Sequence, residues 1–417
     1  MARPTHARID LDAVMHNVGA VKALIGERKL CAAVKADGYG HGAPAVARAM
    51  SAAGADMFGV AMTEEGVELR QCGIRKPVIL LTAVAESDID EILDYDLSAC
   101  ITDEGFARKL SERAVRRNLR ASAHVNVDTG MRRVGLHHTS AREAILRIGQ
   151  LPNIRIEGIF SHFACSDAEG QQTSKLQLAR FLEVVAALKS DGMRVPLIHM
   201  ANSAGVLRMP DSYLDCVRPG LILYGLHPQG LSHLSRSAVH LKPVLSLQTV
   251  ISFCKRVPAG EKLGYGHTFT TWRESTIATL PIGYHDGYMR QYSNLGQVLV
   301  RGRRASVVGR VCMDQTLVDV TDVPGAGVGD EVVIYGEQRG RRINIEEMAL
   351  LLGRVPYELT CSVGGRVRRQ YVLNGAVVGE TAMRSLVPAS LVQQIFAERG
   401  SGQDEQAQTD PGRRGAA

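Results

Sequence analysis

Short apolar runs alternate with helix-like segments through the first half of this chain of 417 residues, and that alternation limits the folds open to it. Eight apolar runs have strand character: Leu30–Val34, Met57–Val60, Val78–Leu81, Leu97–Ile101, Ala121–Val127, Ile156–Phe160, Leu197–Met200 and Leu221–Tyr224. Helix-like segments such as Ala107–Asn118 and Ser174–Lys189 separate most of them. Asp10 or Asp12 is a candidate cap for an earlier helix that runs to about Ile25. Eight strands with crossover helices over roughly 225 residues predict a (β/α)8 barrel of the TIM type, although a doubly wound sheet fits the same pattern.

The pattern changes after about residue 235, where short β-branched runs are separated by Gly, Pro and Asp. We expect strands at Leu241–Phe253, Thr276–Leu280, Gln297–Val300, Ala305–Val311, Gln315–Val320 and Glu331–Tyr335. One short helix is expected over Asn344–Leu352. The sequence therefore predicts a barrel domain over residues 1–235 and a mainly β domain over residues 236–380. Residues 398–417 lack large apolar side chains and are predicted to be a disordered tail.

Composition narrows the class of protein. The net charge is +6, but the densest arginine groups lie in strand-like sequence, where alternate side chains face solvent, so a nucleic-acid partner is not expected. The eight cysteines show neither a CxxC pair nor zinc-like spacing, and most lie in apolar sequence, as Cys31, Cys100 and Cys254 do. Buried reduced thiols and no metal are the resulting expectation. No apolar run has the length of a signal peptide core or a membrane span, which predicts a cytoplasmic protein.

Residues 33–42 carry the strongest chemical signal and read Ala-Val-Lys-Ala-Asp-Gly-Tyr-Gly-His-Gly. A small apolar strand delivers Lys35 to its carboxyl end, and a glycine-rich turn follows. A lysine amine can form a Schiff base with a carbonyl cofactor. Glycine backbone can approach a phosphate closely, and Tyr39 can donate its hydroxyl to it. A lone lysine beside a lone turn is more often simply solvated, so other residues have to support this interpretation.

Four further motifs lie at the carboxyl ends of predicted barrel strands, or just before the last one. Asp128-Thr-Gly precedes two arginines at an expected helix start, and His162 follows a strand. Ser203 lies at a helix start, where it serves equally well as a phosphate ligand or as an ordinary N-cap. Arg218 precedes a turn and the last strand candidate. Each signal is weak alone, but barrel enzymes build active sites on this face, so together they predict one site.

The Lys35 segment resembles the pyridoxal-phosphate segment of the bacterial alanine racemases. The four motifs above match that family in order, as do residues 263–267, 281–288, 309–315 and 356–358 of the β domain. The resemblance covers roughly residues 4–372. It implies a pyridoxal 5'-phosphate barrel with an appended β domain, working as a homodimer with shared active sites. The implied reaction is the racemisation of L-alanine and D-alanine, which supplies D-alanine for peptidoglycan.

The resemblance also implies a role for individual residues. Lys35 resembles the Schiff-base lysine, and Tyr265 resembles a second catalytic base that reaches in from the other subunit. Cofactor contacts are implied for Tyr39, His162, Ser203, Arg218, Gly220, Leu221 and Tyr357, with His199 behind Arg218. Substrate contacts are implied for Arg133 and Met313, and an access channel for Tyr284 and Arg290.

The chemistry of these residue types suits racemisation. Inverting an α-carbon requires a proton to leave one face and another to arrive on the opposite face, so one base on each face is sufficient. A guanidinium is always protonated, so the pyridine nitrogen that faces Arg218 is expected to stay unprotonated. The cofactor is then a weaker electron sink, and reprotonation at the α-carbon is favoured over transamination.

Asn126 is the clearest departure from the family pattern. Many members carry at this position a lysine that is carboxylated and holds the neighbouring arginine; asparagine cannot be modified in this way. Either a bound anion such as chloride or the neutral amide must position Arg133. A smaller departure is Arg368, where proline is common.

Two other functions stay open. One is a racemase of another small or basic amino acid, which Met313 and Tyr357 weakly disfavour by crowding the side-chain site. The other is a single-domain barrel that carries pyridoxal phosphate without catalysis. Such carriers lack the β domain and hence Tyr265, so its presence argues for an enzyme.

Overall fold

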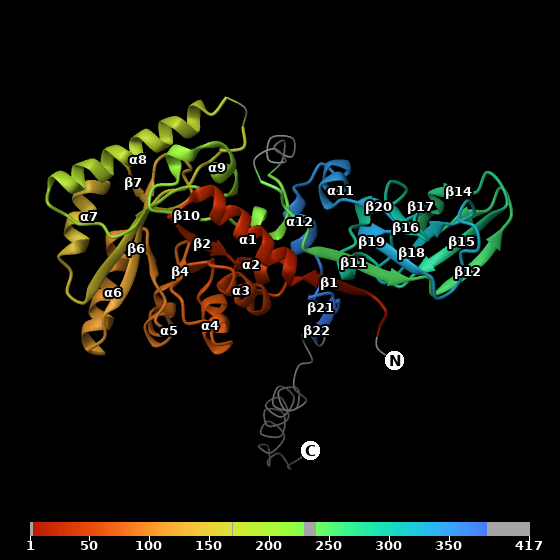
Figure 1. Ribbon diagram of the computed structural model, residues 1–417, viewed down its shortest axis with the longest axis horizontal. Coiled ribbons are helices and arrows are strands. Elements are labelled where there is room, and N and C mark those ends of the chain that lie inside the picture. Colours follow the sequence, from red (N-terminus) through yellow and green to blue (C-terminus); the bar gives the residue numbers. More distant parts are fainter. Residues whose placement is uncertain (1–2, 169, 229–238, 382–417) are drawn as a thin grey trace, which may run out of the picture.

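Two lobes make up the computed structural model, which describes residues 3–168, 170–228 and 239–381. A β/α barrel lies beside a mainly β domain, and between them the first strand of the chain, β1 (His6–Asp10), pairs with β21 (Arg368–Leu373) (Figure 1). The barrel contains the helices α1 (Leu11–Ile25), α2 (Lys35–Tyr39), α3 (Ala43–Ala52), α4 (Thr63–Gln71), α5 (Ile89–Asp94), α6 (Glu104–Arg116), α7 (Ala141–Gly149), α8 (Gln172–Ser190) and α9 (Ser203–Arg208). Asp10 caps α1, because its carboxylate accepts a hydrogen bond from the Ala13 N–H at 2.8 Å.

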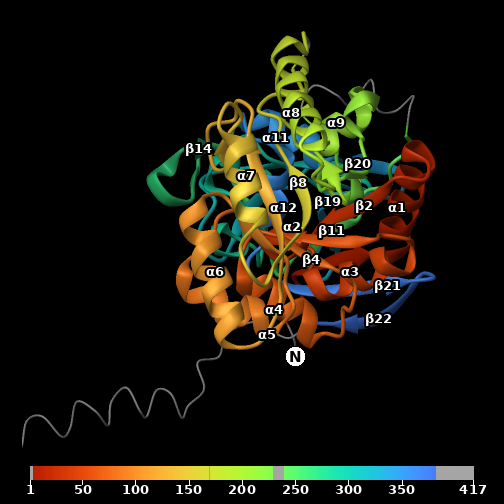
Figure 2. The same ribbon diagram turned by 90° about the vertical axis from the view of Figure 1, so that its left-hand side faces the viewer.

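The barrel is built from eight parallel strands: β2 (Lys29–Ala33), β3 (Met57–Val60), β4 (Val78–Leu80), β5 (Ala99–Ile101), β6 (Ala121–Asp128), β8 (Ile154–Phe160), β9 (Ile198–His199) and β10 (Cys216–Val217). Their order is β4-β3-β2-β10-β9-β8-β6-β5, with the two-residue β7 (Leu136–His137) beside β6. A parallel bridge between Ile79 and Ser98 joins the two ends of this order and closes the ring. The barrel helices lie around the strands (Figure 2). The predicted barrel is therefore confirmed, and the alternative of an open doubly wound sheet is excluded.

One predicted strand is wrong. Leu221–Tyr224 forms a short 3-10 helix, η3, and the eighth barrel strand is β10, which ends one residue before Arg218. All four residues of η3 are buried, which explains why all four are apolar. A short, continuous apolar run has the same sequence pattern whether it forms a buried strand or a buried helical turn. The correction places Arg218 at the carboxyl end of a strand, like the other site motifs. The expected helix start at the two arginines is also wrong, since Arg132 and Arg133 lie in an irregular segment before β7.

The β domain is one sheet with the order β12-β15-β18-β17-β16-β19-β11-β1-β21-β22, and β20 pairs with β19. Its strands are β1 (His6–Asp10), β11 (Leu245–Val250), β12 (Phe253–Val257), β15 (Ser275–Leu280), β16 (Gln297–Val300), β17 (Arg303–Val307), β18 (Thr316–Asp319), β19 (Glu331–Gln338), β20 (Arg341–Ile343), β21 (Arg368–Leu373) and β22 (Ala376–Glu380). A separate hairpin joins β13 (Lys262–Leu263) to β14 (Phe269–Thr270), and two helices, α11 (Ile345–Leu351) and α12 (Pro356–Cys361), lie between β20 and β21 in the chain. The mainly β character is confirmed. The predicted boundary at residue 235 and the predicted disordered tail lie outside the described residues.

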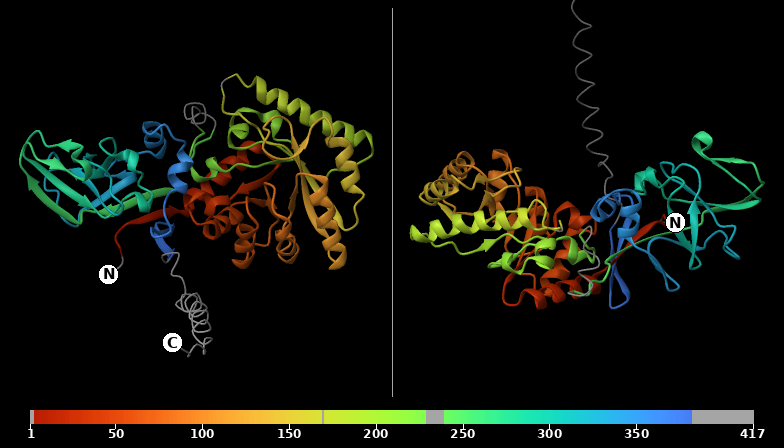
Figure 3. Two further views of the ribbon diagram at one scale, coloured as in Figure 1. Left: turned by 180° about the vertical axis from the view of Figure 1, so that it is seen from behind. Right: turned by 90° about the horizontal axis from the view of Figure 1, so that it is seen from above.

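The two lobes are interlocked by the first strand of the chain. Although β1 precedes the barrel in sequence, it lies in the sheet of the β domain, antiparallel to β11 and parallel to β21 (Figure 3). From β21, the buried Arg369 guanidinium reaches the barrel and donates hydrogen bonds to the Gly40 carbonyl at 3.2 Å. The Tyr371 hydroxyl packs so close to Gly42 that a Cβ there would lie 1.9 Å from it. The β domain is therefore fixed directly against the turn that follows Lys35.

The described residues contain no helix that is long and apolar enough to cross a membrane. All eight cysteines are free thiols, of which Cys31, Cys100 and Cys216 are buried. Cys254, which we expected to be buried, is only partly covered, because β12 lies at one end of the sheet.

Candidate active site

A single left-handed turn follows the site lysine. The backbone φ angles of Ala36, Asp37, Gly38 and Tyr39 are all between 52° and 61°. Only glycine adopts this region without strain, and each other residue costs roughly 1–2 kcal/mol. Strain of this kind persists only where surrounding contacts compensate for it, and it gathers at functional sites. The sequence predicted a glycine-rich turn here but gave no sign of its handedness.

Glu65 compensates for the strain and was missed by sequence reasoning. Its carboxylate accepts hydrogen bonds from the backbone N–H groups of Ala36 at 2.6 Å, Ala61 at 2.8 Å and Met62 at 3.2 Å. At the other end of the turn, the Asp37 carboxylate accepts from the Ala43 N–H at 3.0 Å. One side chain of α4 thus ties the turn after β2 to the loop after β3. Glu65 gave no signal in the sequence beyond an acidic residue in the first turn of a helix.

The environment of Lys35 favours a neutral amine. Burial lowers the pKa of its ammonium, and the nearby positive charge of Arg133 lowers it further. Glu65 acts in the opposite direction but more weakly. A neutral amine is the form that attacks a carbonyl or accepts a proton.

Four residues form a polar cradle beside the left-handed turn. The Ser203 hydroxyl accepts a hydrogen bond from the Gly220 N–H at 3.0 Å, and a Cβ on Gly220 would lie 2.4 Å from the Tyr39 hydroxyl. The ring of Tyr357, from α12, meets the Tyr39 ring edge-on at 6.5 Å. Burial raises the pKa of Tyr39 well above its usual value, so its hydroxyl stays a donor. The alternative of Ser203 as an N-cap is wrong, because the Asn202 side chain caps α9 instead and accepts from the Gly205 N–H at 2.9 Å.

Arg218 is buried among groups that accept its hydrogen bonds. Its guanidinium donates to Nδ1 of His199 at 2.9 Å, to Nδ1 of His162 at 3.2 Å and to the Ser161 carbonyl at 2.7 Å. It also lies 5.0 Å from the centre of the Phe160 ring. The described contacts include no carboxylate on Arg218, so its positive charge stays uncompensated at the centre of the barrel face.

The hydrogen bonds from Arg218 determine the tautomers behind it. Because the His199 Nδ1 accepts, its proton lies on Nε2 and is donated to Nδ1 of His124 at 2.9 Å. Burial, followed by the charge of Arg218, lowers the pKa of His124 and of His162 to about 3. The pKa of His199 is lowered well below its usual range for the same reasons. All three imidazoles are therefore neutral near pH 7, and the sequence had not singled out His124 for this role.

Arg133 and Asn126 occupy different environments on the same face. The Arg133 side chain is exposed, and its charge contributes to the lowered pKa values of Lys35 and His162, which places it on their side of the barrel. Asn126 is buried on β6, and its amide oxygen would lie 2.4 Å from a Cβ on Gly135. Whether an anion or the amide itself positions Arg133 stays a prediction.

The β domain presents its expected site residues on exposed loops. Tyr265 is 72% exposed, Met313 52% and Tyr284 41%. The loops are joined, since the N–H of Tyr284 donates to the Cys312 carbonyl at 3.0 Å and Gly264 packs against Arg310. Exposed aromatic and methionine side chains on adjoining loops are typical of a surface that another molecule covers.

Within one chain these loops do not meet Lys35. The β13–β14 hairpin, which brackets Tyr265, lies at the end of the β domain away from the barrel, whereas α2 lies near the middle of the molecule (Figure 1). Tyr357 is the exception, because α12 packs directly on α2. One chain therefore brings together the lysine, the cradle and Arg218, and leaves the hairpin that carries Tyr265 apart from them.

Fold and candidate site together define a class: two-domain proteins in which a β/α barrel presents a partly buried lysine at a strand end and is followed by a mainly β domain. Comparison with known proteins agrees with this class. Residues 9–228 match the family model of the alanine racemase N-terminal domain, and residues 244–371 match that of the C-terminal domain. The alanine racemase of Clostridium tetani is 41% identical over 379 residues, which span 90% of this chain and 97% of that protein.

Solved structures give the same result. The alanine racemase of Clostridium difficile 630 superimposes with a TM-score of 0.88 at 33% identity, over 92% of this chain and 100% of that one. The alanine racemase of Bacillus anthracis, solved with bound L-Ala-P, superimposes with a TM-score of 0.85 at 31% identity, over 92% of this chain and 98% of that one. This chain belongs to the alanine racemase family.

Proposed function

We propose that this amino-acid racemase interconverts L-alanine and D-alanine with pyridoxal 5'-phosphate held at Lys35, and so supplies D-alanine for peptidoglycan. The observation that carries the proposal is the convergence of Lys35, the Tyr39–Ser203–Gly220 cradle and Arg218 at the carboxyl ends of the barrel strands. The relatives named above are alanine racemases, and this chain matches nearly their whole length, which supports alanine as substrate.

The residues present fit this cofactor. Glycine at position 220 leaves open the space beside the Tyr39 hydroxyl that a Cβ would fill. The hydroxyls of Tyr39, Ser203 and Tyr357 and the backbone N–H groups of Gly220 and Leu221 would hold the phosphate. Arg218 would face the pyridine nitrogen, with His162 against the ring. Bound pyridoxal phosphate acts as an electron sink that makes the α-proton of an amino acid removable.

Protons move at two atoms of the protein. Lys35 Nζ removes or returns the α-proton on one face of the substrate, and burial, which lowers the pKa of its ammonium, favours the neutral form that can accept a proton. The Tyr265 hydroxyl serves the opposite face, from a second copy of the chain. Two bases on opposite faces invert the α-carbon without moving the substrate.

Arg218 selects the reaction. A guanidinium donates hydrogen bonds but cannot supply a proton near neutral pH, so a pyridine nitrogen held against Arg218 would stay unprotonated. The bound cofactor would then be a weaker electron sink, which favours return of the proton to the α-carbon over transamination. The neutral imidazoles of His199 and His162 accept from Arg218 and keep it from turning away.

The remaining site residues bind the substrate. Arg133, the exposed cation near Lys35, pairs with the substrate carboxylate, and Met313 of a second copy contacts the same group. The separation of Tyr265 from Lys35 within one chain supports a homodimer with two shared sites. Tyr284 and Arg290 line the access channel. We place the enzyme in the cytoplasm, where the D-alanine would be made.

The proposal is tested by comparing the purified protein with Lys35→Ala. The unaltered protein should absorb in the visible region, retain the cofactor covalently after borohydride reduction, and convert L-alanine to D-alanine in a chiral assay. Lys35→Ala should lose all three properties, whereas Lys29→Ala, at the start of the same strand, should keep them. Borohydride-fixed cofactor in Lys35→Ala would refute the assignment. Faster turnover of another amino acid would refute alanine as substrate.

A further inference from the structure

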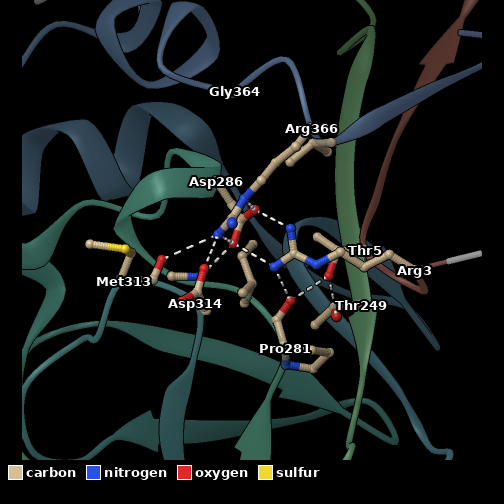
Figure 4. Close-up of polar contacts among 12 residues, drawn as sticks. Arg3, Thr5, Thr249, Pro281, Asp286, Met313, Asp314, Gly364 and Arg366 are labelled. Carbon is tan, nitrogen blue, oxygen red and sulfur yellow. Dashed lines mark hydrogen bonds and ion pairs between the residues drawn. The ribbon is translucent and has the colours of Figure 1, made fainter. Parts of the chain in front are cut away.

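Asp286 is the most buried acidic group of the β domain among the described residues, and the reaction above does not use it. Its side chain has no exposed surface. The carboxylate pairs with the Arg3 guanidinium through both oxygens, the second at 2.7 Å from Nη2. It also accepts from Nε of Arg366 at 2.6 Å and from Nη2 at 3.1 Å (Figure 4). A buried carboxylate held by two forked arginines is a strong and geometrically specific arrangement.

The two arginines come from the two ends of the fold. Arg3 precedes β1 and Arg366 precedes β21, and these strands pair in parallel with His6 opposite Arg368. Arg3 also donates to the Pro281 carbonyl at 2.8 Å, which the Thr5 hydroxyl shares at 2.7 Å. Strand pairing therefore delivers both cations to one carboxylate on the 3-10 turn η5 (Tyr284–Asp286).

This carboxylate holds the turn that carries Tyr284. It accepts from the Gly283 N–H at 2.8 Å, which closes the turn on itself. Gly283 in turn lies against residues 312–313, where a Cβ would come within 2.3 Å of the Cys312 carbonyl oxygen and 2.4 Å of the Met313 carbonyl oxygen. The turn and the Met313 loop therefore form one unit.

Arg366 extends the same network to Met313. Its Nη2 donates to the Met313 carbonyl at 3.4 Å and pairs with the Asp314 carboxylate at 2.6 Å. The Met313 carbonyl also accepts from the His285 N–H at 3.1 Å. Met313 is thus fixed through its backbone while its side chain stays 52% exposed. Two arginines and two carboxylates make the network neutral overall, so it contributes shape rather than charge to the surface.

We propose that Asp286, Arg3 and Arg366 are positioning residues that set where Met313 and Tyr284 meet the amino-acid substrate in the neighbouring subunit's site. The inference rests on the proposed function, because it assumes that this surface faces the substrate. A shift of the loop by a fraction of an ångström would weaken contact with a ligand as small as alanine, and misplacement of about 1 Å is known to cost on the order of 10²-fold in rate.

The test compares Arg366→Lys and Asp314→Asn with Asp322→Asn. Lysine can pair with Asp286 but lacks the fork that reaches Met313 and Asp314. Asp322→Asn is the matched control, because Asp322 is also an exposed carboxylate of the β domain paired with one arginine, Arg273. We expect Arg366→Lys and Asp314→Asn to raise KM for alanine roughly 10-fold. Their kcat, visible absorbance and thermal midpoint should change little, and the control should match the unaltered enzyme.

A double-mutant cycle shows whether Arg366 acts through Met313. If it does, adding Arg366→Lys to Met313→Ala should raise KM no further, because the side chain being positioned is already gone. Unchanged KM in both single variants would overturn the inference, as would additive effects in the cycle. A loss of stability or cofactor equal to the loss of activity would do so too. Absence of racemisation by the unaltered protein would instead refute the proposed function, which distinguishes the two failures.

Discussion

At the scale of single residues, the polar centre of the barrel is built around one uncompensated cation. Arg218 donates to four acceptors, and two of them are imidazoles that can accept only while neutral. Protonating His199 or His162 would therefore break a hydrogen bond and place two positive charges together. His124 is constrained in the same way, because its Nδ1 accepts a hydrogen bond from His199 Nε2 and can do so only while it is unprotonated.

The buried imidazoles predict how stability depends on pH. An unfolded histidine has a pKa near 6.5, whereas that of His124 in the folded state is about 3. The buried neutral imidazoles contribute fully to stability at any pH above the pKa that histidine has in the unfolded chain. This contribution is lost as the pH falls below that value, because only the unfolded chain then takes up the proton. Each such imidazole should lower the free energy of unfolding by about 1.4 kcal/mol per pH unit in this window.

Urea unfolding at several pH values measures this slope. His124→Asn should unfold with a shallower pH dependence below about pH 6.5, since one depressed imidazole is gone. His137→Asn, which alters an exposed imidazole, should keep the slope of the unaltered protein. Equal slopes in both variants would contradict the assignment.

Tyr265 and Lys35 should serve opposite faces of the substrate, Tyr265 acting on L-alanine and Lys35 on D-alanine. Tyr265→Phe removes only the hydroxyl, and loss of a general base costs roughly 10²–10⁴-fold. Racemisation should fall by that much in both directions, because its equilibrium is unchanged. Deuterium wash-in from D₂O at the α-carbon should fall far more for L-alanine than for D-alanine. Equal losses would refute the assignment of faces, and Tyr95→Phe, on the barrel surface, serves as the control.

At the scale of elements, the left-handed turn shows how contacts distant in sequence stabilise a strained segment. Ala36, Asp37 and Tyr39 would not adopt positive φ angles in a free peptide. Glu65 from α4 and the hydrogen bond from Gly38 N–H to the Val34 carbonyl at 2.8 Å hold them there. The turn aims the Tyr39 hydroxyl at Gly220 and the cradle.

Glu65→Ala should therefore loosen this turn. Three backbone N–H groups would lose their acceptor, at a cost of about 1–3 kcal/mol for each that stays buried. We expect faster release of cofactor on dialysis, followed by visible absorbance, and a lower thermal midpoint. Glu64→Ala, at the adjacent exposed position, should behave like the unaltered protein. Cofactor retention that is the same in both variants would show that the turn does not depend on Glu65.

At the scale of the whole molecule, the elongated arrangement of two lobes separates the two proposed bases. Lys35 lies in the barrel, next to its junction with the β domain, and the hairpin around Tyr265 lies at the other end of that domain (Figure 1). A closed dimer in which each β domain reaches the partner's barrel would bring each pair of bases together and generate two equivalent sites.

Mixing two inactive variants tests this arrangement. In a hybrid dimer of Lys35→Ala and Tyr265→Phe, one site has both native bases and the other has neither. Random exchange makes half of the dimers hybrid, so activity should recover to about a quarter of that of the unaltered enzyme. As a control, mixing Lys35→Ala with a chain that carries both Lys35→Ala and Tyr265→Phe should restore no activity, because no site then contains Lys35. Sites formed within single chains would give no recovery in either mixture, even after subunit exchange is verified.

The sequence by itself determined the alternation of eight strands with helices, the β domain and the segment that carries Lys35, whereas the choice of a closed barrel over a doubly wound sheet came from the structure. These features depend on local periodicity and on residue types at short spacing, and both can be seen in a linear chain. Of the cradle residues, Tyr39 and Ser203 could be named from the sequence as candidate phosphate contacts, although Ser203 was equally compatible with an N-cap. Gly220 and Tyr357 could be named only through family resemblance.

Only the tertiary structure decided the features that depend on partners far apart in the chain. It made Leu221–Tyr224 a 3-10 helix, placed β1 in the sheet of the second domain, and turned the residues after Lys35 into the left-handed region. It also supplied Glu65 and Asp286 with partners from other elements. The physical reason is that a buried polar group stabilises a conformation only if a partner group from another part of the chain completes its hydrogen bond or ion pair. A local sequence pattern carries no information about which distant residue will be that partner.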